Sequence, residues 1–153
     1  MPSLYPVSSN VPSGEIVSAL PFGRRAGKPL ADGVSPCQGT DRLGPTAVLR
    51  SVSKFNHEDV DGGTLCNLKL DPSLVAGEAG LRRLADFLIA FLDMGQYHVQ
   101  FNVVDEKTLR AAQASPEEHR SLLVRVAGYS AYFVELSEDI QNDIISRTTQ
   151  RAL

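Results

Sequence analysis

The sequence predicts a mixed fold of the α/β class, with an α+β arrangement as the alternative. Apolar residues recur at helical spacing in residues 78–94, whereas apolar and polar residues alternate in residues 65–70, as they do in a strand. Other short strand-like runs are separated from one another by helical segments. With 153 residues and a hydrophobic fraction of 42%, the chain can form one compact domain with a sizeable core.

The composition argues against several classes of function. The net charge of −3 does not suggest the basic patch that a nucleic-acid partner requires, and no apolar run is long enough to span a membrane. Residues 1–12 lack the basic start and apolar stretch of a secretory signal. The two cysteines, Cys37 and Cys66, lie far apart, without zinc or iron–sulfur spacing. We therefore expect no metal site, and reduced thiols in a cytoplasmic protein.

Residues 1–45 contain most of the proline and glycine, which excludes long helices and central strands. Apolar residues are interspersed, so we expect an ordered, winding loop that packs against another surface; a disordered linker is the alternative. The strand-like residues 4–7 follow a start of only three residues, which suggests a cut inside a larger fold. An ordinary N-terminal strand paired within its own sheet is the alternative.

The middle of the chain predicts two helices and two strands. A short helix is expected over residues 46–56, with Thr46 as a candidate cap, and a half-buried strand over residues 65–70. Residues 78–94 form the clearest helix, and their apolar face is wide enough to predict burial on more than one side. A second strand is expected over residues 97–104.

The last third predicts two more helices and a strand. Asp105 is a candidate cap for a helix over residues 108–114, and residues 122–126 are typical of a strand. Ser137 can cap a final helix, because acidic residues follow it and arginines lie near its end, as the helix dipole favours.

The informative segment is residues 125–131 (RVAGYSA), between a strand and an aromatic pair. From the residues alone, Gly128 marks a bend or a close backbone approach. The segment, however, resembles the signature of the glycyl radical enzymes, the family that includes pyruvate formate-lyase, glycerol dehydratase and choline trimethylamine-lyase. Other segments resemble the same enzymes in the same order: residues 23–33 (GRRAGKPLADG), 44–49 (GPTAVL), 95–103 (GQYHVQFNV), 116–125 and 141–148 (QNDIISRT). The form of the loop is more similar to the dehydratase, lyase and decarboxylase branch.

This resemblance implies the C-terminal segment of a glycyl radical enzyme barrel, with short strands and helices around a buried glycyl radical loop. Residues 1–76 would be the incomplete, loop-rich end of the barrel domain, and residues 77–153 the glycine radical domain. Gly128 would carry the radical. Glycine suits this role because it has no Cβ to crowd a planar radical carbon between an amide nitrogen and a carbonyl.

The resemblance also implies partners. A separate iron–sulfur activating enzyme would use S-adenosylmethionine to remove the Gly128 α-hydrogen, so the radical itself is the cofactor and no other is bound. In the family, the radical passes to a cysteine that, in the dehydratase branch, is followed two residues later by glutamate. Neither Cys37 nor Cys66 has that glutamate. The chain would thus be an incomplete enzyme that needs the remainder of the barrel or a full-length partner.

Further residues receive roles by resemblance. Arg125 would anchor the loop through hydrogen bonds and Tyr129 through packing; an ordinary surface arginine and core tyrosine are the alternatives. His98 and Gln100 could line the socket of the loop, or be ordinary polar residues of a strand. Tyr5 is expected to line the substrate pocket of a full-length partner.

Three functions stay open at this point. The chain is the C-terminal part of a glycyl radical lyase or dehydratase, a stand-alone spare subunit that repairs an oxygen-damaged partner, or a structural module without a radical. The family-like sequence that continues to the first residues favours the first.

Overall fold

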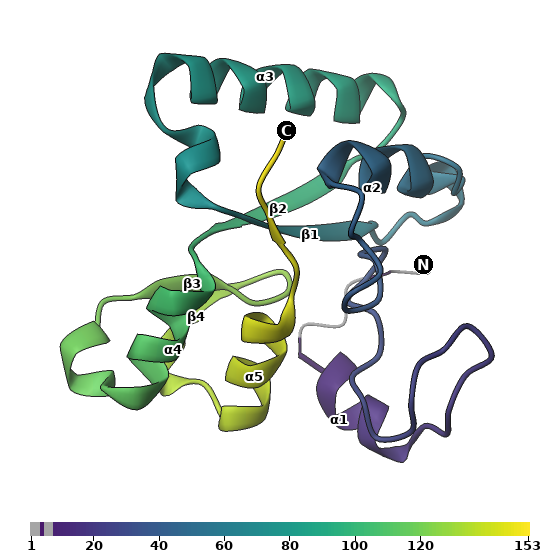
Figure 1. Ribbon diagram of the computed structural model, residues 1–153. Coiled ribbons are helices and arrows are strands. Elements are labelled where there is room, and N and C mark those ends of the chain that lie inside the picture. Colours follow the sequence, from purple (N-terminus) through teal and green to yellow (C-terminus); the bar gives the residue numbers. More distant parts are fainter. Residues whose placement is uncertain (1–3, 5–7) are drawn as a thin grey trace.

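The computed structural model describes Leu4 and residues 8–153 and confirms a mixed fold of short strands and helices (Figure 1). A three-stranded parallel sheet has the order β2-β1-β5, with β1 (Leu65–Leu70) between β2 (His98–Val103) and β5 (Thr149–Gln150). Two further strands, β3 (Leu123–Arg125) and β4 (Ser130–Tyr132), form an antiparallel hairpin.

The central pairing joins β1 and β2 over their full length, from Leu65 opposite His98 to Leu70 opposite Val103. Parallel neighbours require a crossover connection, and α3 (Gly77–Asp93) supplies it. The predicted strand at residues 65–70 and the predicted helix at residues 78–94 are both confirmed within one residue.

The sheet separates two apolar cores. On one side, α2 (Pro45–Val52) and α3 pack against it, as Figure 1 shows. On the other side lie the hairpin, α4 (Glu106–Ala114) and α5 (Glu138–Ser146). The first core comprises Val48, Leu49, Val52, Cys66, Leu68, Leu70, Leu74, Phe87 and Phe91. The second comprises Val104, Leu109, Ala112, Val124, Val126, Phe133, Ile144 and Ile145.

The described part of residues 1–45 is an ordered loop with one two-turn helix, α1 (Asn10–Ile16). Arg24 organises it, because its buried guanidinium donates hydrogen bonds to the carbonyls of Gly14, Val17, Ser18, Arg25 and Lys28. Leu4 forms a parallel bridge to Thr64, and the rest of the strand-like residues 4–7 lies outside the described residues. Single-turn 3₁₀ helices occur at His57–Asp59, Pro72–Val75, Pro116–His119 and Phe133–Glu135.

Two burial predictions were wrong. All six residues of β1 are buried, not alternate ones, because β1 has a neighbour on each edge and a core on each face. The helix α3, by contrast, contacts the sheet with one side, so Leu81, Ile89 and Leu92 remain 57–61% exposed. Its wide apolar face is therefore only partly covered within this chain.

Of the three predicted helix caps, one forms the expected side-chain hydrogen bond. Asp105 caps α4 as expected, since its Oδ1 accepts a hydrogen bond from the Thr108 amide at 2.6 Å. Thr46 does not cap α2, because Pro45 begins the helix and Gly44 precedes it, and α2 ends at Val52 rather than at residue 56. Ser137 occupies the N-cap position of α5 without a side-chain hydrogen bond. No helix among the described residues is both long and apolar enough to cross a membrane.

Lys69 provides a pH-dependent contribution to stability. It is 2% exposed, and its Nζ donates to the carbonyls of Ile144 and Ile145 at the end of α5. Burial lowers its pKa from 10.5 to about 8, so the unfolded chain binds more protons between these values. The free energy of unfolding should therefore gain a rising contribution between pH 8 and 10.5.

Urea unfolding of the wild type and of Lys69→Met across this pH range tests the prediction. The difference between the two stability curves should grow with pH, because the other titrating groups contribute equally to both proteins. The exposed Lys54→Met is the control and should follow the wild type. Parallel curves for wild type and Lys69→Met would contradict the prediction.

Candidate functional site

Gly128 lies at the tip of the hairpin. Leu123, Val124 and Arg125 pair with Tyr132, Ala131 and Ser130, and the Val126 amide then donates to the Tyr129 carbonyl at 2.9 Å. This bond closes a tight turn with Ala127 and Gly128 at its centre. Gly128 has a φ of +88°, a backbone region that side chains disfavour, so the turn itself favours glycine at this position.

The residues before Gly128 are buried, whereas Gly128 is not. Val126 and Ala127 are at most 2% exposed and Tyr129 is half-buried, but Gly128 is exposed. The prediction of a buried loop therefore holds for the base of the turn. Gly128 itself is open because no element of the described chain covers the outer side of the turn.

A polar face of the sheet lies beneath this turn. Side chains alternate along a strand, so the face opposite the first core carries Asn67 and Lys69 from β1 and His98, Gln100 and Asn102 from β2. The parallel register sets Asn67 beside Gln100 and Lys69 beside Asn102. The interspersed polar residues thus converge on the hairpin side of the sheet.

Gln100 contacts Gly128 directly. Its Oε1 accepts a hydrogen bond from the Gly128 amide at 3.2 Å, while its Nε2 lies 2.8 Å from His98 Nε2. Because the Gln100 amide nitrogen can only donate, His98 must accept with an unprotonated nitrogen. Burial and the nearby charge of Arg125 lower the pKa of His98, which favours this neutral form. The structure thus brings Gln100 to the turn and His98 behind it.

Arg125 holds the other side of the tip. Its guanidinium donates to the Gly128 carbonyl at 3.4 Å and to Ser130 Oγ at 3.0 Å. Its own backbone is fixed by Asn102, whose Oδ1 accepts from the Arg125 amide and whose Nδ2 donates to the Arg125 carbonyl, both at 2.7 Å. Tyr129 packs against the second core. Tyr5 lies outside the described residues.

A buried ionic cluster, which the sequence analysis did not predict, supports the base of the turn. The Val126 carbonyl accepts from Arg147 Nη1 at 2.9 Å and from Asn67 Nδ2 at 3.4 Å. Arg147 in turn contacts Asp143 at 2.9 Å and Asp32 at 3.4 Å, and Asn67 also donates to Asp32. Burial raises the pKa of Asp32, and the Arg147 charge partly opposes that rise. The available signals were Asn67 among the apolar residues 65–68 and the position of Asp32, Asp143 and Arg147 within the family-like segments 23–33 and 141–148, but neither signal paired these residues.

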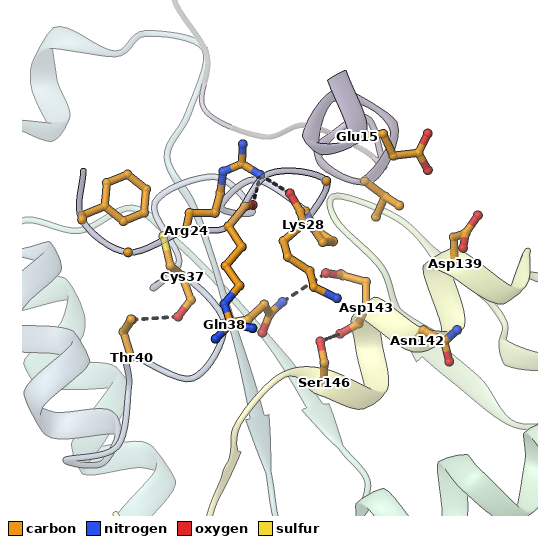
Figure 2. A pocket seen from close by; sticks show the side chains of 16 residues that line it. Glu15, Arg24, Lys28, Cys37, Gln38, Thr40, Asp139, Asn142, Asp143 and Ser146 are labelled. Atoms are coloured by element: carbon orange, nitrogen blue, oxygen red, sulfur yellow. Dashed lines mark hydrogen bonds between the residues drawn. The ribbon is translucent and has the colours of Figure 1, made fainter. Parts of the chain in front are cut away.

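The remaining candidate features lie away from the tip. Cys66 is buried, which raises the pKa of its thiol to about 12 and keeps it protonated. Cys37 lines a cavity of about 670 Å³ between α1, the loop of residues 22–40 and α5, as Figure 2 shows, and the hairpin does not line it. Among the described residues, no group of three His, Cys, Asp or Glu side chains could hold a metal ion.

Comparison with known proteins identifies the fold and its family. Residues 30–134, more than half of the chain, match the family described as glycine radical. The chain belongs to this glycine radical family. The isethionate sulfite-lyase of Oleidesulfovibrio alaskensis is 50% identical over 150 residues, which cover 97% of this chain and 18% of the lyase.

Solved structures agree with this assignment. The glycerol-bound B12-independent glycerol dehydratase of Clostridium butyricum is 51% identical, with a TM-score of 0.96 over 99% of this chain and 19% of the dehydratase. A glycyl radical enzyme from Archaeoglobus fulgidus is 46% identical, with a TM-score of 0.87 over 97% of this chain and 19% of that enzyme. The chain thus corresponds to the C-terminal region of glycyl radical enzymes and spans about a fifth of the length of these relatives.

The Asn102 amide should be a principal anchor of the hairpin. Asn102→Ala leaves the amide and carbonyl of Arg125 without their partners, so we expect a loss of about 1–3 kcal/mol in the free energy of unfolding. Amide exchange at Arg125 should accelerate as well. Urea unfolding and hydrogen exchange measure these effects.

Asn142→Ala is the matched control, because Asn142 is exposed on α5 and the hydrogen bond that it accepts from Gln113 is also exposed to solvent. It should change stability by no more than about 0.5 kcal/mol. Equal effects of the two substitutions would show that the Asn102 amide does not anchor the hairpin.

Proposed function

We propose that this chain stores a glycyl radical on Gly128, as the radical-bearing region of a glycyl radical lyase or dehydratase. The proposal rests on the backbone conformation and hydrogen bonds of Gly128 in a chain that belongs to the glycine radical family. Its backbone adopts a φ of +88° at an exposed turn, and its amide and carbonyl are both held by side chains.

These two hydrogen bonds suit a backbone radical. A radical at the Gly128 α-carbon is stabilised when the amide nitrogen releases electron density and the carbonyl withdraws it. Gln100 accepts from the N–H and thus enriches the nitrogen, whereas the cationic Arg125 donates to the carbonyl and strengthens its withdrawal. Both contacts therefore polarise the peptide units in the direction that delocalises the radical. Arg125 would be an electronic as well as a mechanical anchor, and Tyr129 an anchor by packing.

The activation step requires access to the Gly128 α-carbon. A separate iron–sulfur activating enzyme would use S-adenosylmethionine to abstract the α-hydrogen, and the exposure of Gly128 in this chain would permit the approach. A stored radical also needs shelter from solvent and oxygen. The cover would come from the remainder of a barrel or a full-length partner. The exposed apolar face of α3, on the opposite side of the sheet, would be a separate contact surface for such a partner.

Turnover would need a cysteine from that partner. Cys66 is a buried, protonated thiol in β1, and Cys37 lies in a cavity that the hairpin does not line. Neither suits transfer of the radical from Gly128 to a substrate. Residues 1–76 would complete the barrel and residues 77–153 form the glycine radical domain, with β1 and β2 joining the two parts.

The second candidate is a spare subunit that docks on an oxygen-damaged enzyme and restores its radical. The two apolar cores on either side of the sheet favour it, because a replaceable part must fold by itself. Electron paramagnetic resonance distinguishes the candidates. The chain is incubated without oxygen with an activating enzyme, reductant and S-adenosylmethionine, with and without a full-length glycyl radical enzyme that lacks its radical glycine.

A glycyl doublet with restored turnover supports the spare subunit, and a doublet without turnover supports the radical-bearing part of a larger enzyme. Absence of the doublet, in parallel with a relative that is activated by the same enzyme, overturns radical storage by this chain.

Gly128→Ala should abolish the doublet while the chain remains folded. Gly95→Ala is a matched control, because Gly95 also has a positive φ of +77° and has open space where a Cβ would lie, but is remote from the hairpin. This control should keep the signal at a similar cost in backbone strain. A doublet that persists in Gly128→Ala would assign the radical to another residue.

Oxygen should break the backbone of the activated chain at Gly128. The expected products are a large fragment and a tail that begins near Tyr129, resolved by mass spectrometry. The unactivated chain and Gly128→Ala should stay intact under the same conditions. An activated chain that survives air without cleavage would count against a radical at this site.

A further inference from the structure

We propose that Arg147 is a positioning residue for the radical loop, and that its contact with the Val126 carbonyl sets how readily the turn that carries Gly128 opens. This inference rests on the proposed function, since opening matters only if Gly128 must reach an activating enzyme. Its structural part, the hold of Arg147 on the turn, can be tested without a radical.

Side-chain hydrogen bonds attach the turn to the rest of the molecule. The hydrogen bond between Val126 and Tyr129 lies within the hairpin and does not tie the turn to the rest of the molecule. The recorded attachments to other elements are the bond from Gly128 to Gln100 and the two bonds that the Val126 carbonyl accepts from Arg147 and Asn67. The Arg147 bond is the shortest of the three, at 2.9 Å, and the one with a charged donor, which makes it the strongest attachment.

Arg147 is itself held firmly by two carboxylates. Its side chain is 10% exposed and lies between Asp143, at 2.9 Å, and Asp32, at 3.4 Å. Gln38 donates to the other oxygen of Asp143 at 3.1 Å, as Figure 2 shows. The planar guanidinium is therefore fixed in place by α5 and by the loop of residues 32–38, and it can donate to Val126 without moving.

The buried ionic cluster connects the turn to two distant parts of the chain. Arg147 links the turn to the end of α5 and to the Gly/Pro-rich loop. Gln38 of that loop and Asp143 of α5 are more than 100 residues apart in sequence. Breaking the bond from Arg147 to Val126 removes the strongest of these three attachments and leaves the weaker bonds from Asn67 and to Gln100, while the paired residues of β3 and β4 can stay together. The turn can thus open locally without unfolding of the sheet.

The test uses Arg147→Lys, which keeps the positive charge between two buried carboxylates but loses the fork that also reaches Val126. Hydrogen exchange at the Gly128 amide should accelerate roughly tenfold or more, since a hydrogen bond from a charged group is lost. Exchange at Leu68 in the central strand should stay slower than exchange at Gly128 in both proteins, because the turn opens without unfolding of the sheet. Under anaerobic activation, the glycyl doublet should appear faster than in the wild type.

Two further variants complete the experiment. Arg151→Lys is the control, because Arg151 is exposed near the end of the chain, and it should match the wild type in both measurements. Asn67→Ala removes the second donor to Val126 without a change in charge, and should shift exchange in the same direction by a smaller factor. If Arg147→Lys does not fold, exchange in Asn67→Ala tests whether the donors to the Val126 carbonyl control opening of the turn.

The outcomes separate the two proposals. Exchange at Gly128 that is equal in wild type, Arg147→Lys and Asn67→Ala overturns the positioning role, whatever the radical does. Faster exchange at Gly128, with Leu68 still slower than Gly128, supports it, even if no variant forms a radical and the proposed function fails. Faster exchange with an unchanged rate of radical formation overturns the claim that Arg147 sets access for activation.

Discussion

The parallel register of β1 and β2 is the constraint on which the site depends. It aligns Asn67 with Gln100 and Lys69 with Asn102, so that one face of the sheet, whose central strand β1 is buried throughout, is polar. Buried polar groups are costly without partners. Here their partners are backbone groups of the hairpin and of the end of α5, which gives each polar side chain a defined position in the structure.

This arrangement explains how the turn can be both well defined and able to move. A strand within a sheet is held by a ladder of backbone hydrogen bonds, which break together. The turn at Val126–Tyr129 is held from below by individual side chains, Asn67, Gln100 and Arg147, each of which can release separately. Such local contacts permit opening on a scale far below global unfolding. Under the proposed function, the loop would shelter the Gly128 α-carbon and also present it to an activating enzyme, which requires this combination.

Two features outside this polar interior are exposed. Gly128 is open at the tip of the hairpin, and α3 leaves Leu81, Ile89 and Leu92 uncovered on the opposite side of the sheet. A chain that spans about a fifth of the length of its relatives is expected to expose such surfaces. The polar face is completed within the chain, whereas the outer cover of the turn is not. The described residues thus include the side chains that position Gly128, but not a cover that would protect a radical there.

Local signals in the sequence determined much of this molecule: the strand at residues 65–70, the helix at residues 78–94, the Asp105 cap, and the glycine that a turn with positive φ requires at position 128. They depend on side-chain periodicity and backbone geometry over a few residues, which is why they can be read without a structure. The tertiary structure alone decided that β1 is buried on both faces, that α3 is covered on one side, and that Arg147 lies between Asp32 and Asp143 beneath Val126. These outcomes depend on contacts between segments up to 115 positions apart, as between Asp32 and Arg147, and no local pattern carries information about such distant partners.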